Sequence, residues 1–314
     1  MNWPDDYINK LICGDCLKII KELPNECINC VITSPPYWGL RDYGHDEQIG
    51  LEKTPEEYVI KMVELFREVR RILKDDGTLW LNLGDSYIGG GRGQDYCNEG
   101  SIQKAQIDSG CKYGKPTGKI DGLKAKDLCG IPWMVAFALR ADGWYLRQDI
   151  IWHKPNPMPE SVTDRCTRSH EYIFLLSKSA QYYYDHELIK EDAICKKDPR
   201  ADYGRLHYRG KREGKEGTGQ ESFVSIVENR NKRSVWTVTT KPFSGAHFAT
   251  FPQDLILPMV LAGCPHGGIV FDPFMGAGTT ALVAKKNGCN FIGCELNPEY
   301  IKIAKNRTSQ EYFL

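Results

Sequence analysis

The sequence predicts an α/β protein with a mainly parallel, doubly wound sheet. Apolar, β-branched segments such as residues 27–33 alternate with amphipathic segments such as residues 54–77. A continuous apolar run is typical of a strand buried on both faces. Alternation of such strands with helices favours a parallel sheet covered by helices on both sides. The chain has 314 residues, enough for one large domain that carries insertions.

Each expected element follows from the local pattern. The expected strands lie at 10–13, 27–33, 78–84, 144–154, 170–178, 269–272 and 290–295. The expected helices lie at 16–24, 54–77, 131–143, 251–264, 279–288 and 297–307. The second helix has clear end signals: Thr54 as N-cap, Pro55 in the first turn, Glu57 closing a capping box, and Gly77 at the end.

Composition excludes several classes of protein. Lys plus Arg and Asp plus Glu both number 41, so a nucleic-acid partner would need a local basic patch. No apolar run reaches the ~20 residues of a membrane span. The first residues lack the pattern of a signal peptide, and 12 Cys without one indicate reduced thiols in a cytoplasm.

Two Cys pairs have the spacing of zinc knuckles, Cys13 with Cys16 and Cys27 with Cys30. These residues border or interrupt apolar, strand-like runs, where a free Cys packs as a small buried residue. We therefore expect packing to explain all four and expect no metal site.

Two polar segments interrupt the α/β pattern. Residues 86–128 are rich in Gly and Lys, and residues 186–233 are polar throughout. Within 195–233, eleven Lys and Arg face six Asp and Glu, an excess of five positive charges. Each segment read alone is a solvated loop, but loops of this length in a compact domain are usually functional.

A Gly-rich turn follows the strand at 269–272. Gly276 and Gly278 lie between that strand and a helix, and Glu295 ends the next strand. Glycines there allow a ligand to approach backbone N–H groups, and an acidic residue at the next strand end commonly binds a ribose diol. The G-x-G-x-x-G and Walker spacings are both absent. The pattern predicts a nucleoside site at the carboxyl edge of the sheet.

A second motif, "TSPPY", directly follows the strand at 27–33. Two prolines end the strand and fix the backbone of a Ser and an aromatic residue at the sheet edge. Together with "DPFMGAGTT", this motif resembles the S-adenosylmethionine-dependent DNA amino-methyltransferases, which modify N4 of cytosine or N6 of adenine. The order, Ser-Pro-Pro-Tyr early and the Gly-rich element late, is similar to that of the family's β group.

The resemblance implies a circularly permuted, Rossmann-like methyltransferase sheet with polar target-recognition insertions. It divides the chain into three parts. Residues 1–185 form the catalytic part with the Gly-rich insert at about 86–128, residues 186–233 the target-recognition region, and residues 234–314 the cofactor-binding part of the same domain. The sequence leaves the role of the 86–128 insert open, and one interpretation is a second DNA-facing loop.

The resemblance also assigns residues by motif. The catalytic element comprises Ser34, Pro35, Pro36 and Tyr37. The expected cofactor-binding residues are Asp15, His247, Thr250, Phe251, Asp272, Phe274, Gly276, Gly278, Thr279, Thr280 and Glu295. Candidates for the base pocket or for DNA contacts are Trp38, Arg41, Trp152, Lys154, Asn156, Arg209, Lys211 and Arg212.

The chemistry explains why the motif contains these residue types. An exocyclic amino group is a poor nucleophile because its lone pair is delocalised into the ring. Acceptors at the Ser34 side chain and the Pro35 carbonyl would draw the nitrogen toward sp³ geometry, and fixed acceptors need no reorganisation during reaction. Tyr37 would stack on a base that has left the duplex. Methyl transfer is then a direct in-line displacement without a Cys nucleophile.

The target base is less constrained by the sequence. Ser in the first position favours N4 of cytosine, and N6 of adenine remains the alternative. A catalytically silent DNA-binding relative, and a methyltransferase acting on RNA or protein, are more remote alternatives. The expected partner is double-stranded DNA, without a membrane, in a bacterial or phage-encoded cytoplasmic protein. The sequence leaves open whether a restriction endonuclease accompanies it and whether it is a monomer or a homodimer.

Overall fold

A computed structural model of the chain describes residues 2–40, 48–89, 122–193, 229–241 and 251–309. The chain divides into two compact units. The larger unit comprises residues 1–185 and 234–314, and the smaller unit comprises residues 186–233. The assignment of the smaller unit to target recognition stays a prediction, since its division from the rest says nothing of its function.

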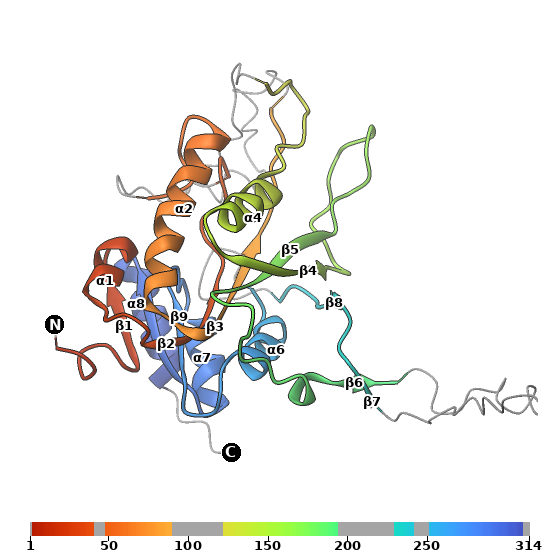
Figure 1. The fold of residues 1–314 in the computed structure, drawn as a ribbon. Helices are drawn as coiled ribbons and strands as arrows, with labels where there is room; N and C mark the ends of the chain where they lie inside the picture. Colours follow the sequence, from red (N-terminus) through yellow and green to blue (C-terminus); the bar gives the residue numbers. More distant parts are fainter. Residues whose placement is uncertain (1, 41–47, 90–121, 194–228, 242–250, 310–314) are drawn as a thin grey trace, which may run out of the picture. The chain divides into compact units, whose positions relative to one another are not determined.

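The larger unit contains one eight-stranded sheet in the order β1-β10-β9-β2-β3-β5-β4-β8 (Figure 1). Its strands are β1 (Lys10–Cys13), β2 (Ile28–Thr33), β3 (Leu73–Leu83), β4 (Tyr145–His153), β5 (His170–Ser177), β8 (Val235–Thr237), β9 (Ile269–Asp272) and β10 (Asn290–Glu295). Strand β5 runs antiparallel to β3 and β4, whereas the other pairings are parallel. The predicted mainly parallel α/β sheet is therefore confirmed.

Helices cover the sheet in two groups (Figure 1). They are α1 (Cys16–Glu22), α2 (Pro55–Ile72), α4 (Ile131–Ala141), α6 (Gln253–Gly263), α7 (Thr279–Lys286) and α8 (Pro298–Ser309). Helix α2 contacts α1 and α4, and α7 contacts α6 and α8. Strand β2 lies between these groups with nearly every residue buried, as its continuous apolar sequence predicts.

The smaller unit contains a 3₁₀ turn, η1 (Glu187–Ile189), and a two-stranded antiparallel ladder of β6 (Glu191–Asp192) and β7 (Asn229–Arg230). Glu191 accepts hydrogen bonds from Arg230 at 2.9 Å and from Arg233 at 2.6 Å. These charge-assisted bonds tie the two ends of the unit together. The described part of the unit is thus the base of the inserted segment.

The predicted end of the second helix is wrong. Helix α2 ends at Ile72, and Leu73 already has extended backbone angles and begins β3. Gly77 lies inside this strand, where the register with β2 shifts. A Cβ at Gly77 would lie 2.6 Å from the Leu73 side chain and 3.0 Å from the Asn29 carbonyl. The glycine thus permits a close approach within the sheet rather than a helix stop.

The start of α2 largely follows the prediction. Thr54 Oγ accepts a hydrogen bond from the Glu57 N–H at 3.2 Å. The Glu57 carboxylate accepts from the N–H of Lys53 at 3.0 Å, one residue before the position that a capping box uses. The cap therefore still satisfies an N–H at the helix start and one on the preceding segment.

Packing explains only some of the four N-terminal cysteines. Cys16 and Cys30 are buried, and Cys27 is half-buried. Cys13 is exposed, with its thiol 3.8 Å from the Leu296 carbonyl, so the prediction that it packs in the core is wrong. Within the described ranges, no three His, Cys, Asp or Glu side chains are grouped as metal ligands. No helix among the described residues is long and apolar enough to span a bilayer.

Candidate active site

The two sequence motifs meet at the carboxyl edge of the sheet. Strands β2 and β9 are parallel neighbours, although most of the chain separates them. At their ends, Thr33 Oγ donates a hydrogen bond to Asp272 Oδ1 at 2.7 Å. This bond joins the residue before Ser34 to the residue that opens the Gly-rich turn. Ligands of open α/β sheets bind at such an edge.

The buried side chain of Asp272 stabilises the Gly-rich turn through hydrogen bonds. Its second carboxylate oxygen accepts from Thr280 Oγ at 2.7 Å, and Oδ1 also accepts from the Phe274 N–H at 3.0 Å. The carboxyl group is fully buried. Burial raises the pKa of Asp272 to about 6, although these hydrogen bonds oppose the shift. Asp272 and Thr280 thus shape the turn from behind, and Thr279 is buried at the start of α7.

The turn itself needs its glycines. Gly276 and Gly278 have φ values of 52° and 80°, in the left-handed region that favours glycine. A Cβ at Gly278 would also lie 2.8 Å from the Cβ of Ala304. The absence of a side chain at Gly278 therefore allows helix α8 to pack directly against the start of α7.

Glu295 stands opposite the turn at the end of β10. Its carboxylate accepts from the N–H of Gly276 at 2.9 Å and from the N–H of Asn297 at 2.8 Å. The Glu295 carbonyl accepts from the N–H of Gly14 at 3.0 Å. Asp15 follows as the N-cap of α1 and accepts from Leu17 N–H at 3.0 Å. The predicted nucleoside-binding carboxylates, Asp15 and Glu295, therefore lie on adjacent strand ends.

Helix α2 and the backbone at the end of β3 both contact the Ser-Pro-Pro-Tyr element. Tyr58 of α2 donates to the Pro36 carbonyl at 3.0 Å. A Cβ at Gly84 would lie 2.5 Å from the Tyr37 ring, so this ring packs directly on the backbone at the end of β3. Pro35 is buried, whereas Ser34 and Tyr37 are half-buried. The element thus presents Ser34 and Tyr37 with a fixed backbone.

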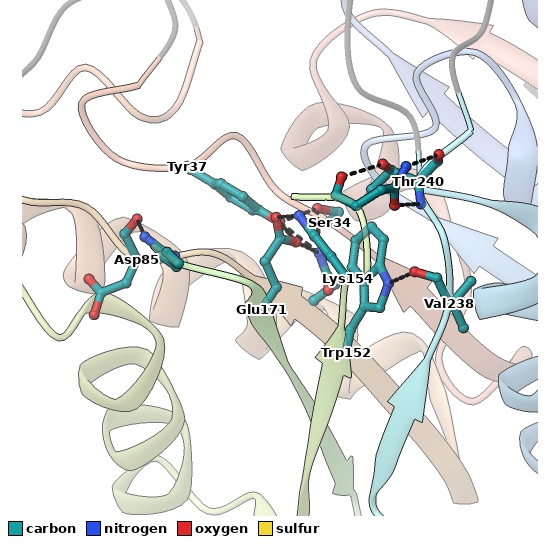
Figure 2. Close-up of polar contacts among 11 residues, drawn as sticks. Ser34, Tyr37, Asp85, Trp152, Lys154, Glu171, Val238 and Thr240 are labelled. Atoms are coloured by element: carbon teal, nitrogen blue, oxygen red, sulfur yellow. Dashed lines mark hydrogen bonds and ion pairs between the residues drawn. The ribbon is translucent and has the colours of Figure 1, made fainter. Parts of the chain in front are cut away.

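Sequence reasoning missed a polar network around Tyr37 (Figure 2). Tyr37 Oη donates to Glu171 Oε2 at 2.7 Å and lies 3.3 Å from Ser34 Oγ. Asn82 Nδ2 donates to Tyr37 Oη at 2.6 Å, to Glu171 Oε2 at 3.0 Å and to Ser34 Oγ at 3.3 Å. Lys154 Nζ pairs with the other oxygen of Glu171. One signal was visible: Asn82 interrupts an otherwise apolar strand.

The pKa values of Glu171 and Tyr37 in this network are shifted in opposite directions. Burial opposes ionisation of Glu171, but the Lys154 ammonium and several hydrogen bonds outweigh it and lower the pKa of this carboxyl group. Burial, and then the Glu171 charge, raise the pKa of Tyr37 well above its ordinary value. Glu171 is therefore ionised and Tyr37 is a neutral hydrogen-bond donor at neutral pH. Among the described residues, the buried Asn82 Oδ1 has no hydrogen-bond partner.

The predicted base-pocket residues have different positions. Trp38 is only 1% exposed and donates to the Glu52 carbonyl at 2.9 Å, so the prediction that its ring meets the base or DNA is wrong. Trp152 is buried and supports the Lys154 ammonium, 4.3 Å above its ring centroid. Asn156 is exposed and exchanges two 3.0 Å hydrogen bonds with the backbone of Thr240.

Several predicted residues lie outside the described residues. They are Arg41, Arg209, Lys211, Arg212, His247 and Thr250. Phe251 and Phe274 are described, and both are half-buried. The described site therefore joins two groups: the Gly-rich turn with its carboxylates, and the Ser34–Tyr37 element with the network behind it.

The geometry defines a class of protein: a doubly wound α/β protein whose nucleoside-type turn adjoins a rigid Ser-Pro-Pro-Tyr element. Comparison with known proteins gives the family. The DNA methylase family (N6_N4_Mtase) matches residues 28–306. This chain belongs to that family.

Relatives of known type match along nearly the whole chain. Type II methyltransferase M.Cfr9I of Citrobacter freundii is 47% identical over 298 residues, covering 95% of this chain and 87% of that protein. Type II methyltransferase M.SmaI of Serratia marcescens is 49% identical over 301 residues, covering 95% and 90%. The chain is therefore a DNA methyltransferase of the N4/N6 type.

Solved structures share the fold. PvuII DNA methyltransferase (cytosine-N4-specific) aligns with a TM-score of 0.64 and 18% identity, covering 97% of this chain and 88% of that chain. TTHA0409 from Thermus thermophilus, solved as a complex with S-adenosyl-L-methionine, aligns with a TM-score of 0.56 and 22% identity, covering 95% and 94%. These likenesses support the α/β fold with a mostly parallel central sheet.

Proposed function

We propose that the protein transfers a methyl group from S-adenosylmethionine to the exocyclic N4 of a cytosine that is flipped out of duplex DNA. The main support for this function is a contact between the two sequence motifs. The 2.7 Å bond between Thr33 and Asp272 brings the Ser-Pro-Pro-Tyr element and the Gly-rich turn together at one edge of the sheet. A donor bound at the turn and a base bound at Ser34 would therefore be neighbours.

The residues at the turn fit S-adenosylmethionine. The Gly276–Gly278 backbone leaves room for the methionine part, and Glu295 and Asp15 offer carboxylate acceptors to ribose and adenine. Asp272 and Thr280 act by holding the turn, since both side chains are buried against each other. Thr279, Phe274, Phe251, His247 and Thr250 complete the proposed site. The bound cofactor supplies a methyl group activated by a sulfonium.

Ser34 would activate the amino group. Its half-buried hydroxyl receives a hydrogen bond from Asn82 and can accept another from the base. Together with the Pro35 carbonyl, this acceptor would draw the amino nitrogen toward sp³ geometry. Tyr37 rests on the backbone at Gly84 and would offer its ring to the flipped base. Stacking of about 1–3 kcal/mol would offset much of the few kcal/mol that flipping costs.

Two features support cytosine N4. Ser34 supplies a small neutral acceptor, and the PvuII enzyme that shares the fold is described as cytosine-N4-specific. The order of the two motifs supports membership of the β group. The same chemistry on N6 of adenine is the alternative.

The smaller unit is proposed to recognise the target sequence. The chain between 195 and 233 has an excess of five positive charges, eleven minus six, which suits phosphate contacts. The proposed DNA contacts in this segment are Arg209, Lys211 and Arg212. In the larger unit, Arg41 is a further proposed DNA contact. The 86–128 insert is proposed as a second DNA-facing segment. The relatives are named Type II methyltransferases, which supports a restriction endonuclease partner and a bacterial cytoplasm.

Methyl transfer to DNA tests the proposal. Purified protein with labelled S-adenosylmethionine should label unmethylated genomic DNA, and Ser34→Ala should reduce the rate at least about 100-fold. Cofactor binding should survive in this variant because Ser34 lies outside the Gly-rich turn. Labelling by neither protein would indicate the catalytically silent relative, and labelling of RNA or protein alone would assign another substrate.

A further inference from the structure

A continuous hydrogen-bonded chain leads from Ser34 to a buried carboxylate. The Ser34 hydroxyl donates to Tyr37 Oη at 3.3 Å, and Tyr37 Oη donates to Glu171 Oε2 at 2.7 Å. Glu171 lies at the start of β5, 134 residues from Tyr37 in sequence. Figure 2 shows these groups converging at the edge of the sheet.

The donors fix the direction of this chain. The Asn82 Nδ2 amide group is a hydrogen-bond donor to Ser34, Tyr37 and Glu171, so it cannot accept a proton from any of them. A carboxylate of lowered pKa accepts and does not donate, which leaves the Tyr37 hydrogen pointing at Glu171. The Ser34 hydrogen then has Tyr37 Oη as its acceptor. Each hydroxyl oxygen can therefore receive a proton on one side as it passes one on.

The Lys154 ammonium completes the arrangement. It pairs with Glu171 Oε1, the oxygen that Tyr37 does not use, and lies above the ring of the buried Trp152. The carboxylate is thus kept ionised and oriented with Oε2 free for Tyr37 and Asn82. A structural ion pair alone would not need a tyrosine hydroxyl that donates to Glu171 and accepts from Ser34.

We propose that Glu171 is the terminal acceptor of the proton that the target amino group loses, and that the proton travels through the hydroxyls of Ser34 and Tyr37. This inference rests on the proposed function. As the nitrogen–methyl bond forms, the sulfonium–methyl bond breaks and its electron pair stays on sulfur. The amino nitrogen becomes cationic and gives one proton to Ser34 Oγ. Ser34 passes its own proton to Tyr37, and Tyr37 passes its own to Glu171, which becomes a neutral carboxylic acid.

The transfer is favourable in energy. An exocyclic amino nitrogen that carries a methyl group and a positive charge is a much stronger acid than a carboxylic acid. Even a carboxylate with a lowered pKa can therefore take its proton. Concerted movement along the chain avoids a free tyrosinate, which the raised pKa of Tyr37 would make costly. Glu171 can later lose the proton to water once the product has left.

Tyr37→Phe is the most direct test because it removes one hydroxyl and keeps the aromatic ring. The bonds from Lys154 and Asn82 to Glu171 remain, so the fold should be preserved. We expect the single-turnover methylation rate to fall about 100-fold, with unchanged affinities for S-adenosylmethionine and DNA. Tyr7→Phe is the matched control. It removes another tyrosine–glutamate bond of 2.7 Å, to Glu22, outside the site and should leave the rate unchanged.

Chemical rescue separates proton transfer from positioning. In Glu171→Ala, added formate should restore part of the single-turnover rate, and without formate the rate should rise with pH as solvent bases take the proton. The wild-type rate should be flat over the same pH range. Formate should not restore Tyr37→Phe, because its relay is broken before Glu171. Thermal melting and cofactor binding establish that each variant is folded.

The outcomes distinguish this inference from the proposed function. A wild-type enzyme that methylates DNA, with Tyr37→Phe within about threefold of it, would overturn the relay and leave the proposed function standing. A Glu171→Ala variant that is folded, slow and unaffected by formate or pH would show Glu171 to be structural. A wild type without methyl transfer to any DNA would overturn both.

Discussion

At the scale of single residues, the site depends on polar groups that the core keeps in fixed places. Asp272 is fully buried, yet it accepts three hydrogen bonds that connect the Gly-rich turn with β2. Removing a partner of such a group leaves a buried donor or acceptor unsatisfied, at about 1–3 kcal/mol. Motif matching identified Asp272, and the structure shows that it acts on the turn rather than at the surface of the site.

The raised pKa of Asp272 makes a prediction about pH. A carboxyl group whose folded-state pKa is about 6 contributes stability that is fully present below its ordinary pKa of 3.8 and is lost as pH rises through about 6. The free energy of unfolding of the wild type minus that of Asp272→Asn should therefore decrease across this window. Denaturant titrations at several pH values measure it. A difference that does not change with pH would contradict the burial of an ionisable group here.

Residues near a motif could be predicted, and residues far from it could not. Ser34, Tyr37 and Glu295 could be proposed from the sequence because their neighbours in sequence carry the two motifs. Glu171 and Asn82 join the same site from other strands. Their place depends on the antiparallel pairing of β3 with β5, which opposes Asn82 to Ile173 and brings Glu171 close to it. No local pattern encodes that register.

At the scale of elements, periodicity and caps predicted nearly every helix and strand of the larger unit. The failure at α2 has a physical cause. Gly77 is a typical helix-stop residue, but it lies in an irregular part of β3 where the backbones approach closely. Tertiary packing decided the end of the helix, whereas the local cap decided its start.

The cap of α2 can be tested alone. Thr54→Ala removes the side-chain acceptor for the Glu57 N–H and should lower the free energy of unfolding by about 1 kcal/mol. The methylation rate at low temperature should stay unchanged, since the cap lies outside the site. Thr163→Ala changes an exposed loop threonine and should alter stability by less than about 0.5 kcal/mol. Equal effects of the two substitutions would contradict the capping role.

At the scale of the whole molecule, the proposed function assigns methyl transfer to the larger unit and recognition of the target sequence to the smaller unit. The larger unit alone contains the Gly-rich turn, the Ser34–Tyr37 element and the network of Glu171. Replacing 186–233 by a short Gly-Ser linker should therefore preserve S-adenosylmethionine binding. Specific DNA binding should be lost together with the basic segment. Calorimetry with cofactor and fluorescence anisotropy with duplex DNA measure the two effects, and loss of cofactor binding in a folded variant would contradict this division.

The identity of the methylated nucleoside distinguishes methylation of cytosine N4 from methylation of adenine N6. Unmethylated genomic DNA is incubated with the enzyme and S-adenosylmethionine, digested to nucleosides and analysed by mass spectrometry, with Ser34→Ala as the matched control. We expect N4-methylcytosine from the wild type and at least about 100-fold less from the variant. N6-methyladenine as the only product would contradict the assignment of cytosine, and no methylated nucleoside at all would contradict the proposed function.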